Sequence, residues 1–243
     1  KWMIKIIDIK AREIFDSRGN PTVECEMLVE GHPDPFFGLV PSGASTGKFE
    51  ALELRDNDNQ RMSGKGVLKA VDNINTSIKP HLINTSFNDY KDFDNSILSL
   101  DGTDNKSKYG ANAILSLSLA FYKAWSYLNY NKIYLSQGSN DLSIPVPMLN
   151  IINGGQHADN DVDFQEFMIL PINFGNLKEA LSASHDVISK IKKNLKSKNH
   201  NTNVGDEGGF APNLKSHIEV LDIICDSIES AGYQINNHFK ISL

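Results

Sequence analysis

The sequence predicts an α+β module followed by the beginning of an α/β domain. Strand patterns come first, a run of helical patterns follows, and strands then alternate with helices in the remainder of the chain. The 243 residues suffice for one large or two ordinary domains with a sizeable core. A polar stretch around Gly138 ends the helical run. We therefore expect two domains, at residues 1–138 and 139–243.

The first domain is predicted to open with a three-stranded meander. Residues 3–12 and 22–29 alternate between apolar and polar side chains, and the turn-forming segment 16–21 separates them, which predicts a hairpin. Residues 36–40 form a third strand candidate. Apolar residues at helical spacing then predict three helices, at residues 66–82, 88–100 and 110–128.

The second domain shows strands before helices and a strand again after them. Short apolar strands at residues 146–152 and 167–170 have no helix of usable length between them. Helices are predicted at residues 177–195 and 216–231, and a further strand starts at residue 239. This order is typical of a barrel or a doubly wound sheet, of which the sequence supplies about three strands. We therefore expect an incomplete barrel-type domain.

Charge and composition narrow the function classes. The chain has 30 acidic and 24 basic side chains, a net charge of −6, and no large basic block, so a direct nucleic-acid ligand is not expected. No apolar run approaches the roughly 18 residues of a membrane span, and the start lacks the apolar region of a signal peptide. Cys25 and Cys225 fall in a predicted strand and a predicted helix, as buried thiols do. The sequence predicts a cytoplasmic protein with reduced thiols.

The first candidate site is the loop PSGASTG at residues 41–47, which is rich in hydroxyl groups and glycine. Its backbone amides and oxygens, including the Ser42 hydroxyl, could close over an anion or a hard cation. A plain connection between a strand and a helix would have the same composition. The loop is not a Walker phosphate-binding sequence, because the first glycine of that pattern is missing.

The second candidate site is the polar segment at residues 153–161, between two apolar strands. It contains His157, which could act as a donor or a general acid, or could be an incidental surface histidine. The segment leads to Gln165 and Glu166, where polar side chains meet the start of a strand. A carboxylate at a barrel strand end is either catalytic or a capping group.

The most informative stretch is GDEGG at residues 205–209. Asp206 and Glu207 lie between glycines, and a sharply turning backbone could hold one acid away from water. Burial and a second carboxylate would raise the pKa of that acid, as a general acid requires. The alternative is an Asx-type turn before the next helix.

The order and spacing of these segments resemble the enolase family, from near Ile4 to Leu243. HADN at residues 157–160, followed by VD at 162–163, resembles the bacterial branch. The matching segments are DSRGNPTVE at 16–24, PSGASTG at 41–47, LDGT at 100–103, NKSK at 105–108, GANAIL at 110–115, NGG at 153–155, QEFM at 165–168 and GDEGG at 205–209.

The resemblance implies an amino-terminal capping domain followed by a TIM-like barrel domain. It also implies a Mg²⁺-dependent lyase, phosphopyruvate hydratase, which reversibly dehydrates 2-phospho-D-glycerate to phosphoenolpyruvate in glycolysis. By the same resemblance Glu207 would be the proton donor and Glu166 would assist it. His157, Gln165 and Glu166 would contact the substrate, and Ser42 would ligate a second magnesium ion.

The resemblance further implies a homodimer in the cytoplasm, although family members are also found at the cell surface or secreted. Bacterial enolases also dock in an RNA-degradation assembly. In the family, the carboxylates of the structural magnesium site and the lysine base come after the segment that resembles residues 239–243. The sequence therefore predicts a partial form, or fragment, whose metal site is incomplete.

Two other hypotheses stay open. The first is a catalytically inactive enolase remnant that acts as a binding module or is decaying; dehydration of 2-phosphoglycerate by the purified chain with magnesium would exclude it. The second is an unrelated acid–base enzyme on a small α/β fold, which would need ligands from elsewhere in the sequence.

Overall fold

A computed structural model describes residues 2–43, 46–138 and 142–243. The chain folds into two compact units, residues 1–140 and 141–243. The predicted domain boundary between residues 138 and 139 adjoins residues 139–141, which lie outside the described residues.

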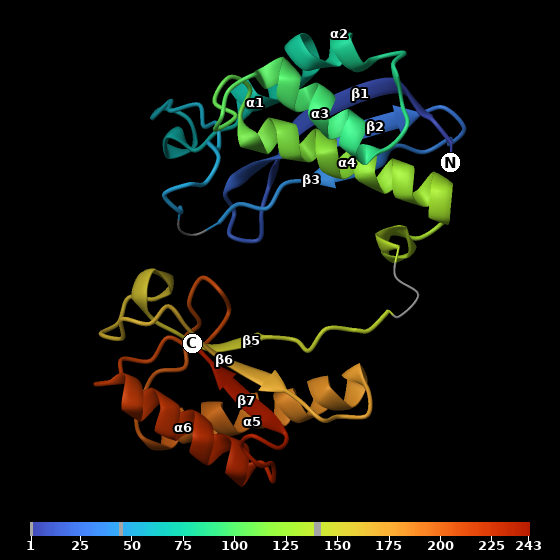
Figure 1. The fold of residues 1–243 in the computed structure, drawn as a ribbon. Coiled ribbons are helices and arrows are strands. Elements are labelled where there is room, and N and C mark those ends of the chain that lie inside the picture. The colour runs from blue at the N-terminus through green and yellow to red at the C-terminus, as the bar shows by residue number, and fades with distance from the viewer. Residues whose placement is uncertain (1, 44–45, 139–141) are drawn as a thin grey trace. The chain divides into compact units, whose positions relative to one another are not determined.

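The first unit is an antiparallel sheet with helices packed against it (Figure 1). The sheet has the strand order β3-β2-β1-β4, and its strands are β1 (Ile4–Phe15), β2 (Pro21–Val29), β3 (Phe36–Leu39) and β4 (Ser86–Phe87). The helical elements are the 3₁₀ turn η1 (Met62–Gly64), α1 (Leu68–Asp72), the π-helical η2 (Asn73–Ile78), α2 (Lys79–Leu82), α3 (Tyr90–Asp101), α4 (Ala111–Tyr130) and the 3₁₀ helix η3 (Ile133–Gln137). The predicted α+β pattern of this part of the chain is confirmed.

The β1–β2 hairpin follows from the alternation of side chains. In β2 every second residue faces the helices, and four of these are almost fully buried: Val23, Cys25, Met27 and Val29. The alternation in β1 is looser because the pairing register shifts between Ile6 and Asp8, as it does at a β-bulge. Burial raises the pKa of the Cys25 thiol to about 12.

Helix α4 is the central helix of the first unit and contacts β2 and β3. The ring of Phe121 on α4 stacks on that of Phe93 on α3, with the ring centroids 4.2 Å apart. A side chain at Gly38 of β3 would bring its Cβ within 1.9 Å of the carbonyl oxygen of Ser116. The helix backbone reaches the strand because position 38 carries no side chain.

The region predicted as a helix at residues 66–82 is helical through α1, η2 and α2, and its middle turn is widened. The apolar residues at helical spacing, Val67, Ala70, Ile74 and Ile78, are buried. Asn75 in the widened turn exchanges two hydrogen bonds with the backbone of Ala11 on β1, at 2.8 and 3.0 Å. These bonds attach the helical segment to the sheet.

The second unit has a three-stranded sheet in the order β5-β6-β7, with α5 and α6 packed against each other and against a shared apolar core. Both strand pairs are antiparallel. Strands that alternate with helices commonly pair in parallel, so strand direction is a feature that the sequence pattern did not reveal. The elements are β5 (Leu149–Asn153), the 3₁₀ turn η4 (Gly155–His157), β6 (Glu166–Pro171), α5 (Leu177–Ser197), α6 (His217–Ser230) and β7 (Phe239–Ser242).

Helices α5 and α6 begin at side chains that accept backbone hydrogen bonds. Asn176 accepts from the backbone N–H of Glu179 at 3.0 Å, and Ser216 accepts from that of Glu219 at 3.2 Å. Such caps fix where each helix starts. No described helix is both long enough and apolar enough to cross a membrane. The two cysteines are free thiols.

Candidate active site

The two polar segments predicted as candidate sites in the second unit meet at one edge of its sheet. Asn153 at the end of β5 pairs with Glu166 at the start of β6, so the loop between them begins and ends at that edge. Residue Phe210, just after the GDEGG stretch, forms a parallel bridge with Ile152. The backbone N–H of Asn153 donates to the carbonyl oxygen of Phe210 at 2.8 Å. Segments far apart in the sequence are thereby held side by side.

His157 joins the two segments. Its side chain is 8% exposed, and its Nδ1 atom lies 3.7 Å from Oε1 of Glu166, so a protonated imidazole would form an ion pair there. The backbone N–H of Asp206 donates to the carbonyl oxygen of His157 at 3.2 Å. His157 therefore contacts Glu166 of β6 with its side chain, and the turn that carries Asp206 with its backbone.

The GDEGG segment forms a tight turn. Gly205 donates its backbone N–H to the carbonyl oxygen of Gly209 at 2.8 Å, and Gly208 donates to Gly205 at 3.1 Å with a left-handed φ of +83°. Asp206 and Glu207 are exposed at the tip of this turn. The sequence suggested that the turn would hold one acid away from water, and within this unit the structure shows the opposite. The backbone bonds occupy the inner side, so the carboxylates project outward.

A hollow with a volume of about 380 Å³ lies beside the turn. His157 lines it, while Gln165 is exposed and lies next to Gly155, where an added Cβ would be 2.8 Å from Cγ of Gln165. Both candidate segments contribute polar residues to the walls of the hollow, among them Gln156, Asp159 and Asp206. A small polar molecule would meet the imidazole of His157 and the side chains of Asp159 and Asp206 there.

Asn153 is a residue that the sequence analysis did not single out as functional. Its side chain is fully buried, and neither polar atom of its amide has a hydrogen-bond partner in the described part of the chain. The amide lies between Gly205 and Gly209, where an added Cβ would come within 2.4 and 2.5 Å of it. Buried polar groups are normally paired, and exceptions call for an explanation. The signal in the sequence was the NGG segment itself, which places a polar residue at the end of an apolar strand.

Asn160 links the same loops from the other side. Its Nδ2 group donates to the carbonyl oxygen of Asn153 at 2.9 Å and to that of Pro212 at 3.1 Å. These two bonds span the start of the His157 loop and the end of the acid-bearing loop. The positions of the candidate residues are therefore set by backbone and amide contacts rather than by bonds between the acids themselves.

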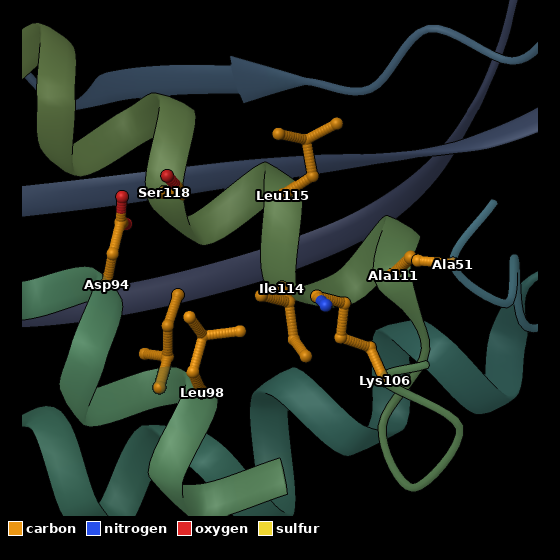
Figure 2. Close-up of a pocket in the computed structure, with 9 residues that line it drawn as sticks. Ala51, Asp94, Leu98, Lys106, Ala111, Ile114, Leu115 and Ser118 are labelled. Atoms are coloured by element: carbon orange, nitrogen blue, oxygen red, sulfur yellow. The ribbon is translucent and has the colours of Figure 1, made fainter. Parts of the chain in front are cut away.

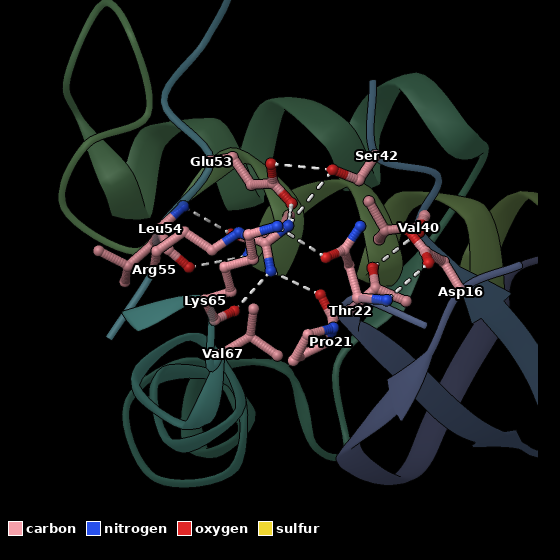
Figure 3. A network of polar contacts seen from close by, with 12 residues as sticks. Asp16, Pro21, Thr22, Val40, Ser42, Glu53, Leu54, Arg55, Lys65 and Val67 are labelled. Atoms are coloured by element: carbon pink, nitrogen blue, oxygen red, sulfur yellow. Dashed lines mark hydrogen bonds and ion pairs between the residues drawn. The ribbon is translucent and has the colours of Figure 1, made fainter. Parts of the chain in front are cut away.

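Ser42, the remaining predicted site residue, belongs to the first unit and lies in a network of polar contacts centred on Arg55 (Figure 3). The Ser42 hydroxyl donates to Oε2 of Glu53 at 3.2 Å, and Arg55 donates to that hydroxyl at 3.3 Å. Arg55 also donates to Glu53 at 2.6 Å and to the carbonyl oxygens of Pro21 and Lys65. Ala44 and Ser45 of the same loop lie outside the described residues.

Arg18 fixes the backbone at Ser42. Its guanidinium donates to the carbonyl oxygen of Ser42 at 2.6 Å, and the turn that carries Arg18 is closed by the Asp16 side chain, which accepts from the backbone N–H groups of Arg18 and Asn20. Sequence reasoning placed Ser42 in a candidate loop but missed the arginines that hold it. These contacts join residues from separate strands and loops, which a linear pattern does not reveal.

The donor atoms around Ser42 do not fit a magnesium site by themselves. Magnesium requires six oxygen ligands in octahedral geometry and is bound mainly by carboxylates and water. Ser42 contributes one hydroxyl, and the adjacent carboxylate of Glu53 already forms an ion pair with Arg55. Within residues 2–43, 46–138 and 142–243, no three His, Cys, Asp or Glu side chains gather as a metal-binding group.

The fold and the site define a class of protein. An α+β unit precedes a barrel-type unit, and the latter carries acids and an imidazole at the edge of its sheet where β5 ends and β6 begins. Two family models match the sequence: the enolase N-terminal domain matches residues 6–136, and the enolase C-terminal TIM barrel domain matches residues 141–243. The chain therefore belongs to the enolase family, which confirms the resemblance carried by the sequence motifs. Its two domains are those of a lyase family of glycolysis, which supports an enolase-type function in general.

Proposed function

We propose that this chain takes part in the enolase reaction, the reversible dehydration of 2-phospho-D-glycerate to phosphoenolpyruvate. Glu207 would be the proton donor and Glu166 would assist it, while His157 and Gln165 would contact the substrate. One observation carries this proposal: His157 contacts Glu166 through its ring and the turn bearing Glu207 through its carbonyl oxygen. Family membership supports it.

The proposed roles follow from the chemistry of the dehydration. A hydroxyl group leaves as water when an acid gives it a proton, and Glu207, at the exposed tip of the short turn beside the hollow, would be that acid. The substrate is an anion, so a protonated His157 would donate a hydrogen bond to one of its oxygens. Glu166 lies 3.7 Å from the imidazole, so the two groups would meet the same part of a bound molecule.

Magnesium belongs to the proposal as the family's cofactor, and Ser42 would be one of its ligands. Bound magnesium would supply positive charge against the substrate's oxygens. Ser42 would first have to exchange its hydrogen bonds to Glu53 and Arg55 for the ion. Because the described residues do not assemble the other ligands, no step of the proposal runs through the ion.

We also propose a homodimer in the cytoplasm, because the enolase family is typically dimeric and glycolytic. Sedimentation equilibrium of the purified protein would test the oligomeric state. A monomer at micromolar concentration would contradict the dimer.

The test of the function is the rate of phosphoenolpyruvate formation from 2-phosphoglycerate with magnesium. We expect Glu207→Gln to lower kcat by about 10²- to 10⁴-fold, the usual contribution of a general acid. Glu229→Gln is the matched control, because Glu229 is exposed on α6 and its side chain makes no hydrogen bond or ion pair within the described residues. Equal turnover by Glu207→Gln and the unaltered protein would contradict the assigned role.

The exposure of Glu207 favours a second candidate function, an enolase-type binding module without turnover. The side chain of Glu207 is not among those that line the hollow beside the turn, where a substrate would bind. Saturable binding of 2-phosphoglycerate without formation of phosphoenolpyruvate would support this second candidate and contradict the first.

A further inference from the structure

A cavity of about 290 Å³ lies in the first unit between α3 and α4, and we call it the α3–α4 cavity (Figure 2). None of the residues assigned to the proposed reaction lines it. Its walls include residues from the LDGT–NKSK–GANAIL region, motifs to which the proposed function gives no task. The lining residues are Ala51, Asp94, Ile97, Leu98, Lys106, Ala111, Ile114, Leu115 and Ser118.

Helical periodicity builds the two main walls. On α4 the lining residues recur at intervals of three and four, so they share one face of the helix, and those on α3 do the same. Ile97 and Ile114 are buried and form an apolar floor, whereas Leu98 and Leu115 are each 40% exposed and form the rim. The cavity is therefore open to solvent and mostly apolar inside.

Backbone hydrogen bonds hold the remaining wall. Leu52, next to Ala51, donates its N–H to the carbonyl oxygen of Asn105 at 2.8 Å, and Ala111 donates to the carbonyl oxygen of Leu52 at 2.7 Å. These bonds join the loop at residue 51 to the turn that carries Lys106. The cavity is thus preformed on a well-bonded frame, which is typical of small-molecule sites.

Asp94 places a carboxylate in this apolar setting. Its Oδ1 atom is buried and has no hydrogen-bond partner within the described residues. Burial raises the pKa of Asp94, and a hydrogen bond with the Ser118 hydroxyl opposes that rise. No described Lys, Arg or His lies within ion-pair distance of the carboxylate. A buried acceptor of this kind is costly unless a donor reaches it.

Lys106 places an ammonium group on the opposite side. Figure 2 shows Asp94 and Ser118 together at one end of the cavity, whereas the Lys106 side chain enters from the other end and its nitrogen lies beside Ile114. Lys106 has a left-handed φ of 59°, fixed by a turn, and its Nζ group donates to the carbonyl oxygen of Asp104 at 3.3 Å. It forms no ion pair with any described carboxylate.

We propose that the α3–α4 cavity binds a small aliphatic zwitterion, with a donor ammonium group at Asp94 and an anionic group at Lys106. The apolar floor between the two charged groups would contact the methylene chain. The cavity volume is at the lower end for ligand sites, which limits the ligand to a short chain. Matched opposite charges at the two ends set its orientation.

The probe is 5-aminopentanoate, titrated into the ¹⁵N-labelled 243-residue chain while amide shifts are followed by NMR. Pentanoate and pentylamine, which each carry one of the two charges, are titrated in parallel. We expect saturable shifts at the amides of α3 and α4 that line the cavity, with a Kd on the order of millimolar. The zwitterion should bind about three- to fivefold more tightly than either single-charge probe.

Variants test which charged group of the ligand binds at each end of the α3–α4 cavity. In Asp94→Asn, 5-aminopentanoate should bind no more tightly than pentanoate. In Lys106→Gln, it should bind no more tightly than pentylamine. Asp92→Asn and Lys108→Gln are the matched controls, because both are exposed neighbours that do not line the cavity. Leu115→Trp, which enlarges a rim residue, should weaken all three probes.

Three results would overturn the proposal. They are the absence of saturable shifts, equal affinity for the three probes, and variants that bind as the unaltered chain does. The amide spectrum of each variant reports whether it is folded, and Asp94→Asn removes the negative charge with little change in the side-chain shape.

Discussion

The Arg55 network of the first unit and the His157 region of the second are both polar and built from loops, but they satisfy their polar groups differently. Around Arg55 the hydroxyl of Ser42 and the carboxylate of Glu53 are paired with the guanidinium. Around His157, by contrast, Nδ1 of the imidazole and both polar atoms of the Asn153 amide are buried without a hydrogen-bond partner in the described part of the chain.

The difference indicates which region stabilises the fold and which is suited to binding or catalysis. Paired polar groups stabilise loops, since each contributes about 0.5–1.5 kcal/mol and leaves nothing buried and unpaired. Unpaired buried groups reduce stability and are found where a protein binds or transforms something. We therefore propose that the Arg55 network mainly positions Ser42, and that the His157 region contacts substrate.

The largest expected loss of stability comes from filling the space beside Asn153. Gly205→Ala would place a Cβ 2.4 Å from the Asn153 amide and 2.4 Å from the carbonyl oxygen of His157. We expect the free energy of unfolding of the second unit to fall by about 2–3 kcal/mol because of overpacking. Hydrogen exchange at the amide of Phe210, which donates to Ile151, would measure it.

The control for this change lies in the same turn. A Cβ at Gly208 would meet no atom within 4 Å, although its φ is +83°. Gly208→Ala should therefore cost only about 1 kcal/mol, the penalty of a left-handed backbone. Equal losses in the two variants would show that the Asn153 amide does not constrain the turn.

A smaller loss of stability is expected when the Arg55 network is disrupted. Arg55→Met would remove donors to Glu53 and to the carbonyl oxygens of Pro21 and Lys65. The free energy of unfolding of the first unit should fall by about 1–3 kcal/mol. Urea unfolding followed by the fluorescence of Trp125, which is buried in this unit, would measure it.

Lys65→Gln is the control for the Arg55 variant. Lys65 makes one exposed side-chain hydrogen bond, to Asn20, so its replacement should change stability by less than about 0.5 kcal/mol. If Arg55→Met lowered the free energy of unfolding as little as Lys65→Gln, the contrast between the two polar regions would disappear.

Acid pH should weaken the first unit through Glu13. A hydrogen bond from Arg61 lowers the pKa of Glu13 below its ordinary value of 4.5, burial opposes this, and the backbone N–H of Val67 adds to it. A lowered folded-state pKa gives stability that is present above pH 4.5 and is lost as pH falls through the folded-state value. Urea midpoints of the first unit between pH 7 and pH 3 should therefore fall less steeply in Glu13→Gln than in the unaltered chain.

The smallest effect, and one of opposite sign, is expected at Asn153. Asn153→Leu replaces two unpaired polar atoms with apolar ones of similar shape, so stability should be unchanged or rise by up to about 1 kcal/mol. Exchange at the Phe210 amide measures this change too. A loss of more than about 2 kcal/mol would show that the amide has partners in solution, and the assignment of the region to function would lose its support.

The sequence predicted the elements well where periodicity carries the information. The strands of the β1–β2 hairpin and the helices α3 to α6 lie within a few residues of the predicted ranges, because each buries a regular apolar face. The sequence did not predict β4, a strand of two residues that pairs with Ile4 and Lys5. A two-residue strand has no period to detect.

The candidate site was predictable only in part. His157, Gln165, Glu166 and Glu207 were chosen because polar residues interrupt apolar strands or lie between glycines, and those segments do lie together. The roles of Asn153 and Arg55 could not be predicted, because each depends on contacts between distant segments. The exposure of Glu207 also escaped prediction, since the same glycines permit a turn that points its acids inward or outward.

The most direct test is an NMR titration of the ¹⁵N-labelled chain with 2-phosphoglycerate in the presence of magnesium. We predict saturable amide shifts at residues 153–157, 165–166 and 205–209, which are weakened by His157→Ala. Saturable shifts confined to other parts of the chain, or the absence of any saturable shift, would contradict the assignment of the His157 region to substrate.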